Sequence, residues 1–291
     1  MTLSAQASEL VRAALDEDLG ERGDITTALT VHGRGPPGRA RIVAKAVGRL
    51  SGVALACEVF TLVDPGVQCQ VHKGDGEAVQ PGDLVLEAVG PAASLLEAER
   101  TALNFLGRLS GVATLTARFV EQVAGTKASI VDTRKTTPGF RLLEKEAVLH
   151  GGGRNHRIGL YDEVLLKENH FAMSGGLSHS ELVARVRGEA DPGTRITAEA
   201  RDMDEARAEA DGGADVILLD NFDVAGLRAA VEAFADHPCR GEFELEASGG
   251  VDLTTVAGIA ATGVDRISVG ALTHSAPALD LSLLLEAEPV S

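Results

Sequence analysis

The chain has 291 residues, enough for one large domain or two of moderate size, and its apolar content of 44% is ordinary for a globular protein. The formal net charge of −16 repels nucleic acids and anionic membranes, and the few aromatic residues (8 Phe, 1 Tyr, no Trp) argue against binding by base stacking. The 3 cysteines lack metal-type spacing, which indicates reduced thiols, and no apolar run approaches the roughly 18 residues of a membrane span. We therefore expect a soluble, cytoplasmic protein.

The first region of the chain is predicted to be α+β. Residues 5–19 have apolar side chains at helical spacing with acidic residues between them, which predicts an amphipathic helix. The sequence Asp24-Ile25-Thr26-Thr27 then predicts a polar turn. Short β-like runs follow, separated by glycine and proline, at residues 41–45, 67–71 and 83–86.

A long helix is predicted over residues 94–123, with a break near Gly107 to Gly111. Arg100 lies at the edge of the apolar stripe of this helix, which contains Leu96 and Leu103. A purely solvent-facing charge is less expected there. Arg100 therefore either extends its aliphatic part along the stripe or serves a binding site.

Beyond residue 125 the pattern alternates between strand-like and helix-like segments. Strand-like apolar runs recur near 128–131, 164–166, 195–200, 215–219, 243–247 and 266–269. Helix-compatible segments lie between several of them, at 180–187, 203–210 and 224–235. A further helix over 253–261 is expected, capped by Asp252. Such alternation predicts parallel strands joined by crossover helices, in a complete or incomplete α/β barrel or, alternatively, an open doubly wound sheet.

Polar or small residues follow these apolar runs at six successive strand ends. They are Asp132 with Arg134 and Lys135, Lys167 with His170, Glu199, Asp220 with Asn221, Glu246 with Ser248, Gly249 and Gly250, and Gly270 with Ala271. Because the active sites of α/β barrels lie at the carboxyl ends of the strands, we expect a functional site there.

A group of basic residues falls in this part of the chain. Its members are Arg134, Lys135, His156, Arg157 and Lys167. Cations packed at strand ends are costly unless they meet anions. An arginine fork binds a carboxylate in a bidentate way and a lysine acts as a point charge, so the set suits a ligand with more than one carboxylate. The alternative is a network of ion pairs with the protein's own acids.

Acidic and glycine-rich positions complete the predicted site. Glu199 and Asp220 are expected at adjacent strand ends, where carboxylates bind a divalent cation, stabilise developing positive charge or share acid–base work. The turns at Ser248-Gly249-Gly250 and Gly270 are expected to expose backbone N–H groups that bind phosphate. Gly151-Gly152-Gly153 predicts either a loop that lets the backbone pass close to a ligand or a flexible connection.

Several motifs resemble those of the quinolinate phosphoribosyltransferase family. They are Asp132-Thr133-Arg134-Lys135-Thr136, Gly151-Gly152-Gly153 followed by Asn155-His156-Arg157, and Leu219-Asp220-Asn221-Phe222. The resemblance extends from Leu15-Asp16-Glu17-Asp18-Leu19 to Val269-Gly270-Ala271-Leu272-Thr273. It implies an N-terminal α/β sandwich over residues 1–112, joined by a C-terminal tail at 274–291, and an open α/β barrel over 113–273.

The resemblance also implies an activity. The expected reaction transfers phosphoribosyl from phosphoribosyl pyrophosphate (PRPP) to quinolinate with decarboxylation, giving nicotinate mononucleotide, pyrophosphate and CO2 in NAD biosynthesis. It implies Mg²⁺ as cofactor, with Glu199 and Asp220 as its ligands. It further implies a homodimer, or a larger assembly such as a hexamer, in which Arg100 completes the neighbour's site.

Family roles carry over to the matching positions of this chain. Arg134, His156, Arg157 and Lys167 are expected to hold the two quinolinate carboxylates, with Lys135 beside them. Ser248, Gly249, Gly250 and Gly270 are expected to receive the 5′-phosphate. The expected catalytic residues are Glu199, Asp220 and Lys135.

Two positions depart from the family pattern. Thr197 stands where an acid is frequent, and Glu146 stands where tyrosine is frequent, near the cationic cluster. These changes favour, as an alternative, a paralogue that acts on a modified pyridine or aromatic acid in specialised metabolism. Two further interpretations are a Schiff-base lyase that uses Lys167 or Lys135, and a phosphometabolite-binding protein without catalysis.

Overall fold

The computed structural model describes residues 4–287. The chain divides into two compact units: unit 1 takes in residues up to 117, residues 137–152 and residues from 276 on, and unit 2 takes in residues 118–136 and 153–275. The boundary expected at residues 112 and 113 falls inside helix α4 (Ala92–Gln122), which runs through both units. Residues 137–152, assigned from the sequence to the barrel, group with unit 1.

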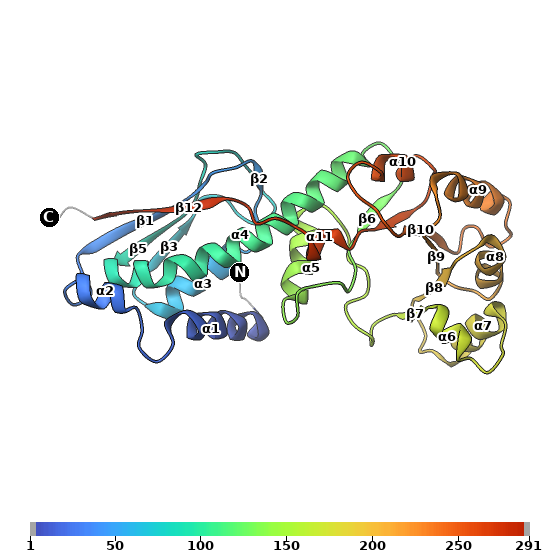
Figure 1. The fold of residues 1–291 in the computed structure, drawn as a ribbon, viewed down its shortest axis with the longest axis horizontal. Helices are drawn as coiled ribbons and strands as arrows, with labels where there is room; N and C mark the ends of the chain where they lie inside the picture. Colours follow the sequence, from blue (N-terminus) through green and yellow to red (C-terminus); the bar gives the residue numbers. More distant parts are fainter. Residues whose placement is uncertain (1–3, 288–291) are drawn as a thin grey trace. The chain divides into compact units, whose positions relative to one another are not determined.

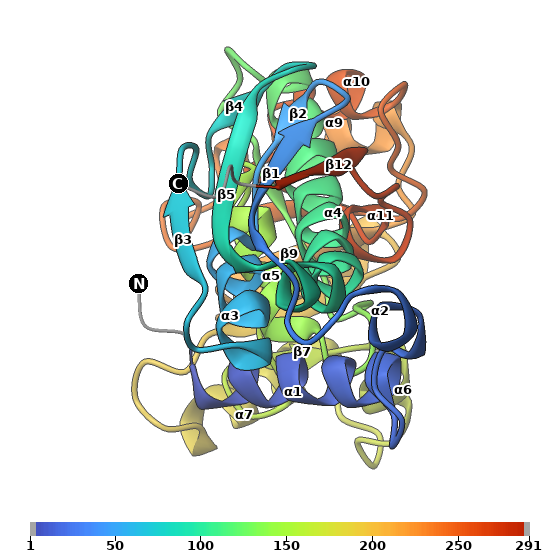
Figure 2. The same cartoon turned by 90° about the vertical axis from the view of Figure 1, so that its left-hand side faces the viewer.

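Unit 1 is built on an antiparallel sheet of strand order β12-β1-β5-β3. The strands are β1 (Pro37–Ala44), β3 (Gln68–Val71), β5 (Leu84–Pro91) and β12 (Leu281–Ala287), with a separate pair β2 (Gly48–Arg49) and β4 (Ala78–Val79). The helices of this unit are α1 (Ala5–Leu19), α2 (Ile25–Thr30), α3 (Val53–Val63), α5 (Arg141–His150) and the first part of α4. Residues of β1 alternate between buried and more exposed, so the sheet buries one face, and α3 lies against that sheet (Figures 1 and 2).

Two predictions for unit 1 are wrong. The expected polar turn is the start of helix α2, because the Asp24 carboxylate accepts hydrogen bonds from the backbone N–H groups of Thr26 and Thr27 and so caps it. The expected break in α4 is absent. Gly107 and Gly111 instead let the C-terminal segment pass close to the helix, since a Cβ on Gly111 would lie 2.1 Å from the carbonyl oxygen of Pro277.

Unit 2 contains six parallel strands in the order β6-β11-β10-β9-β8-β7. They are β6 (Ser129–Val131), β7 (Val164–Leu166), β8 (Ile196–Ala200), β9 (Val216–Asp220), β10 (Glu244–Ser248) and β11 (Arg266–Ser268). The first strand pairs with the last, as in a barrel, while β6 and β7 each pair with only one of the other five strands. The strands are therefore those of a barrel opened between β6 and β7, which confirms the predicted open α/β barrel.

Helices connect the strands of unit 2. They are α6 (Glu168–Ala172), α7 (His179–Glu189), α8 (Met203–Asp211), α9 (Val224–Ala235), α10 (Val256–Ala260) and α11 (Ala271–His274). The helix expected over 253–261 begins only at Val256, because the Asp252 carboxylate accepts from the backbone of Thr254 and Thr255 and holds them in a turn before it. Every residue of β8 is buried, as expected for a parallel strand covered on both faces.

Among the helices of residues 4–287, none is both long enough and apolar enough to cross a membrane.

Candidate active site

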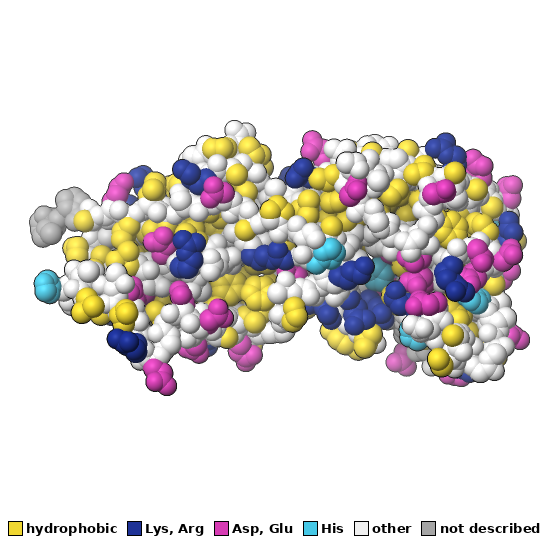
Figure 3. All heavy atoms as spheres, in the orientation of Figure 1, with side chains coloured by type: hydrophobic (Ala, Val, Ile, Leu, Met, Phe, Trp, Pro, Cys, Tyr) yellow, Lys and Arg dark blue, Asp and Glu magenta, His cyan; other side chains and the backbone are white. Residues whose placement is uncertain are grey.

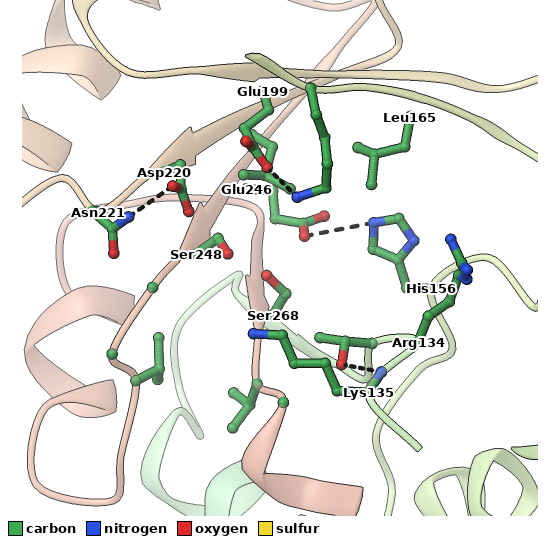
Figure 4. Close-up of a pocket in the computed structure, with 18 of the residues that line it drawn as sticks. Arg134, Lys135, His156, Leu165, Glu199, Asp220, Asn221, Glu246, Ser248 and Ser268 are labelled. Atoms are coloured by element: carbon green, nitrogen blue, oxygen red, sulfur yellow. Dashed lines mark hydrogen bonds and ion pairs between the residues drawn. The ribbon is translucent and has the colours of Figure 1, made fainter. Parts of the chain in front are cut away.

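A cavity of about 780 Å³ opens at the carboxyl ends of the strands of unit 2 (Figure 4). It brings together all of the residues given a catalytic, substrate-binding or metal-binding role from the sequence except Arg100. These are Arg134, Lys135, His156, Arg157, Lys167, Glu199, Asp220, Ser248, Gly249, Gly250 and Gly270. All of its lining residues belong to unit 2. Arg100 is exposed on helix α4 in unit 1 and does not line this cavity.

The cationic side of the cavity is placed by β6, β7 and the segment that precedes β7. Arg134 and Lys135 follow the end of β6, and Lys167 follows the end of β7. Burial lowers the pKa of Arg157, and the nearby positive charge of Arg134 lowers it further. Two guanidinium groups that repel each other across a cavity gain stability from an anion between them.

The backbone and the ring of His156 are both oriented by the protein. The buried Asp132 carboxylate accepts a hydrogen bond of 2.8 Å from the His156 backbone N–H. On the ring, Nδ1 accepts a hydrogen bond of 2.7 Å from the Arg157 backbone N–H, which assigns the ring proton to Nε2. Nε2 in turn lies 3.7 Å from Oε1 of Glu246 (Figure 4).

Glu246 begins a chain of charges that is buried at Glu246 and Arg266 and partly exposed at Glu244 and Arg195. Its carboxylate is fully buried and lies 2.9 Å from Nε of Arg266, which also reaches Glu244 at 3.5 Å, and Glu244 pairs with Arg195. Burial raises the pKa of Glu246, and the charge of Arg266 opposes that shift. From the sequence, Glu246 is predicted only to lie at a strand end. An acid inside the otherwise apolar part of β10 was the available signal.

The acidic side of the cavity comes from β8 and β9. Glu199 is 7% exposed and its Oε2 lies 2.6 Å from Nζ of Lys167. Burial raises the pKa of Glu199, while the hydrogen bond from Lys167 lowers it. Asp220 lies at the end of the adjacent strand, where its Oδ2 accepts a hydrogen bond of 2.7 Å from Asn221. The face of the molecule in Figure 3 shows Lys and Arg side chains close to a group of Asp and Glu side chains.

These carboxylates do not form a complete metal site by themselves. No group of three His, Cys, Asp or Glu side chains within residues 4–287 is arranged to hold a metal ion. Mg²⁺ is usually bound in proteins by one or two carboxylates together with oxygens of a substrate phosphate. The pair Glu199 and Asp220 therefore fits a cation that arrives with an anionic ligand.

The turn after β10 contains two backbone positions that only glycine adopts without strain. Gly249 and Gly250 have φ values of 101° and 59°, and a Cβ on Gly249 would lie 2.1 Å from Oδ1 of Asn221. Asn221 itself is held at φ 58°. On the opposite side, a Cβ on Gly270 would lie 3.1 Å from Cδ of Lys135. Both turns leave backbone close to the cavity, as phosphate binding requires.

Some lining residues were not predicted to belong to the site. They are Thr133, Leu165, Glu168, Arg201, Leu218, Asn221, Glu246, Val251, Ser268, Val269, Ala271 and His274. Glu246 and Asn221 were noted at strand ends, whereas the signal for Glu168, Arg201 and His274 was only their closeness in sequence to a strand end. A polar residue one or two places after a strand, such as Glu168 or Arg201, is too common to be assigned to a site on that basis alone, and His274 lies further on, at the end of α11.

The two departures from the family pattern lie in different places. Thr197 is buried in β8, and its hydroxyl donates a hydrogen bond to the carboxylate of Glu163. Glu146, expected near the cationic cluster, instead lines a separate cavity of about 270 Å³ within unit 1. Gly151, which follows Glu146 closely in the sequence, packs against Thr116 of α4. The absence of a side chain at Gly151 lets its backbone lie close to that helix.

An open α/β barrel with opposed cationic and acidic walls and glycine turns at its strand ends defines a protein that binds phosphorylated and carboxylated small molecules. Family comparisons identify it further. The model "Quinolinate phosphoribosyl transferase, N-terminal domain" matches residues 24–110, and "Quinolinate phosphoribosyl transferase, C-terminal domain" matches residues 112–284. The chain belongs to the quinolinate phosphoribosyl transferase family.

Individual relatives and structures agree with this assignment. The chain is 40% identical over 278 residues to a probable nicotinate-nucleotide pyrophosphorylase [carboxylating] of Bacillus subtilis, covering 96% of this chain and 93% of that protein. It is 39% identical over 295 residues to the chloroplastic enzyme of that name from Oryza sativa, covering 96% of this chain and 77% of that protein. The solved structure of nicotinate-nucleotide pyrophosphorylase from Francisella tularensis matches with a TM-score of 0.89 at 37% identity, covering 98% of each chain.

Proposed function

We propose that this protein transfers the phosphoribosyl group of PRPP to quinolinate and removes the 2-carboxylate, giving nicotinate mononucleotide, pyrophosphate and CO2. The observation that carries the proposal is that one cavity holds a cationic wall, two carboxylates at adjacent strand ends and two glycine turns. Each of these three features suits one part of the two substrates. The membership of the chain in the family supports the same reaction, which belongs to NAD biosynthesis.

The cationic wall is the proposed site for quinolinate. Arg134, Arg157 and Lys167 present positive charges to a ligand with two carboxylates, with Lys135 beside them. His156 has Nδ1 occupied by backbone and Nε2 directed at Glu246, so we propose that it borders the ring as a neutral group. Positioning two polyanions against each other is most of the task of this reaction, and it explains the number of cations.

Glu199 and Asp220 are the proposed catalytic carboxylates. Departure of pyrophosphate leaves positive charge on the ribose carbon, and carboxylates already fixed beside it stabilise that charge. The same two residues would hold Mg²⁺, which supplies charge neutralisation to the pyrophosphate. The backbone at Ser248, Gly249 and Gly270 is the proposed site of the 5′-phosphate.

Decarboxylation follows from the charge on the ring. Attack by the pyridine nitrogen on the ribose carbon makes the ring a pyridinium, and its positive nitrogen stabilises the electron pair left on ring carbon 2 when the 2-carboxylate departs as CO2. A proton from water then replaces the lost carboxylate at that carbon. Among the groups of the cavity, Lys135 lies beside the Gly270 turn, and its carbonyl oxygen accepts a hydrogen bond of 2.8 Å from Thr273. We assign Lys135 to binding substrate charge during these steps.

The assembly and location are also part of the proposal. The exposed position of Arg100 on α4 supports a homodimer, or a larger assembly such as a hexamer, in which Arg100 reaches the cavity of the neighbouring subunit. The free thiols of all 3 cysteines support a reducing, cytoplasmic location. Mixing an Arg100→Ala chain with a Glu199→Gln chain tests the dimer, because activity should return only if sites are shared.

An alternative substrate is a modified pyridine or aromatic acid. The observation that favours it is the hydrogen bond between Thr197 and Glu163, which puts a hydroxyl where the family often has an acid. Glu146 does not support this alternative, because it lines a cavity of unit 1 and is not among the residues that line the cavity of unit 2. Comparing turnover of quinolinate, a hydroxylated quinolinate and nicotinate under identical conditions separates the two substrates.

The decisive experiment is an assay of the purified full-length protein with PRPP, Mg²⁺ and quinolinate, with the product identified by mass. Arg134→Ala should lower kcat/KM for quinolinate by at least about tenfold, since a charged hydrogen bond contributes roughly 1.5–3 kcal/mol. Arg118→Ala is the control, because Arg118 is exposed on α4 outside the cavity. Absence of turnover by a folded protein would contradict the proposal.

A further inference from the structure

Two cysteines of unit 1 lie side by side, outside the cavity described above. Cys57 belongs to helix α3 and Cys69 to strand β3, and both are free and partly exposed. Helix α3 packs against β3, as Figure 2 shows. The short connection of residues 64–67 joins the end of the helix to the start of the strand.

The side chains of the two cysteines face each other across this packing. Cys69 is the least exposed residue of β3, and its cross-strand partner Ala88 is buried, so both point to the covered face of the sheet. On α3, the residues one turn to either side of Cys57, Val53 and Phe60, are also buried. The thiol of one cysteine is hydrogen bonded to the thiol of the other.

This hydrogen bond makes the two thiols chemically different. It lowers the pKa of Cys57, against the opposing effects of burial and of the negative charge of Asp75. The same bond, together with burial, raises the pKa of Cys69. A thiolate on either sulfur is stabilised by the thiol that remains beside it, and the directions of the two pKa shifts favour Cys57 as the sulfur that ionises first. A nucleophilic thiol next to a second thiol is the arrangement found at peroxide-sensitive sites.

We propose that Cys57 and Cys69 form an oxidation site, in which hydrogen peroxide converts the two thiols into a disulfide that joins α3 to β3. The Cys57 thiolate attacks one peroxide oxygen, the O–O bond breaks, and the released hydroxide takes a proton to give water. Cys57 is then a sulfenic acid. The Cys69 sulfur attacks it, the S–O bond breaks, and a second water leaves with the proton of Cys69. The two thiols lose two electrons, and the peroxide gains them.

The disulfide would have a defined structural effect. β3 is an edge strand of the sheet, with β5 as its one neighbour in the described part of the chain. Edge strands separate from a sheet more easily than central ones. A covalent link to α3 would hold the edge strand in place, so amide exchange of residues 68–71 should slow. The thermal midpoint of unit 1 should rise by roughly 5–10 °C.

The test treats the reduced full-length protein with hydrogen peroxide, blocks the remaining thiols with an alkylating reagent and maps the peptides by mass spectrometry without reduction. We expect a peptide pair linked through Cys57 and Cys69, with one alkylated cysteine left from the original 3. Dithiothreitol should reverse both the link and the rise in thermal midpoint. Dimedone should label Cys57 in Cys69→Ser, because the sulfenic acid then has no resolving thiol.

Cys239→Ser is the matched control, because Cys239 belongs to unit 2 and its removal should leave the linked peptides unchanged. Cys69→Ala replaces Cys69→Ser if the serine variant folds poorly. Recovery of both Cys57 and Cys69 as alkylated thiols after treatment that oxidises Cys239 would overturn the proposal. A disulfide between different chains in place of the internal link would overturn it equally. Neither outcome depends on the proposed transferase activity.

Discussion

Two lysines of unit 2 form ion pairs of almost the same kind, and only one of them lines the cavity. Nζ of Lys167 lies 2.6 Å from Glu199, and Nζ of Lys127 lies 2.7 Å from Asp265. Their side chains are 46% and 49% exposed. We predict that Lys167→Met strongly lowers transferase activity while Lys127→Met does not, because only Lys167 lines the cavity. Methionine removes the charge and leaves a side chain of similar length.

The expected changes in stability and in kcat/KM follow from the groups that each ammonium contacts. Removing the half-exposed charge of Lys127 should cost at most about 1 kcal/mol of unfolding free energy. Removing the charge of Lys167 should cost more than that, because it leaves the buried Glu199 carboxylate without its partner. The ammonium of Lys167 is in addition the proposed partner of a quinolinate carboxylate. A hydrogen bond to a charged group contributes roughly 1.5–3 kcal/mol, which corresponds to a loss of about 10- to 150-fold in kcat/KM. The value for Lys127→Met should stay within about twofold, as for other surface changes.

The assay measures nicotinate mononucleotide formation at varied quinolinate with saturating PRPP and Mg²⁺, and urea unfolding gives the stability of each variant. A loss that appears mainly in KM assigns Lys167 to substrate binding. A loss in kcat with unchanged KM assigns it to an interaction made only in the transition state, through Glu199. Equal activities of the two variants, at equal stability, would refute the placement of Lys167 in the substrate site.

Two further predictions concern a buried acid and a glycine turn. Burial raises the pKa of Glu209 from 4.5 to about 9, so the folded state binds this proton more tightly and stability should fall as pH rises between these values. Glu209→Gln should remove that fall, so the urea midpoint of the variant should rise relative to that of the native protein as pH increases toward 9. A difference between the two midpoints that does not change with pH would contradict the prediction. Gly249→Ala should lower kcat/KM by more than about tenfold, because the new Cβ meets Asn221 2.1 Å away in a turn proposed to bind phosphate. Gly213→Ala is its control, with a similar φ of 88° and nothing within 4 Å; equal loss in both would mean that backbone strain alone is responsible.

The strands of unit 2 could be predicted closely because parallel strands buried on both faces appear as short, continuous apolar runs. The run near 215–219 is β9 (Val216–Asp220), and the segment 224–235 is α9 (Val224–Ala235). Once the strands are placed, the carboxyl ends meet at one edge, so Glu199 and Asp220 had to lie close together. The site was therefore predictable wherever a residue directly follows a strand.

Other features depend on contacts that sequence spacing does not reveal. Helix α3 (Val53–Val63) was missed, because its nearly continuous apolar residues show no amphipathic period. The glycines of α4 suggested a break, yet they mark where another segment of the chain approaches the helix. The ion pair between Arg266 and Glu246 joins residues from neighbouring strands whose register was unknown. Register and close approach are properties of the folded chain and need its coordinates.

The pairing of Lys167 with Glu199 also suggests how substrate binding and catalysis are coupled. Without a ligand, each group compensates the charge of the other at 2.6 Å, and burial of Glu199 makes its unpaired charge unfavourable. A quinolinate carboxylate that binds Lys167 would replace Glu199 as its partner. Glu199 would then be released toward the ribose and the Mg²⁺ proposed beside it, where positive charge develops as pyrophosphate leaves. Binding of the acceptor would in this way prepare the carboxylate that stabilises the transition state, so Lys167→Met should weaken both the binding of quinolinate and its effect on pyrophosphate release.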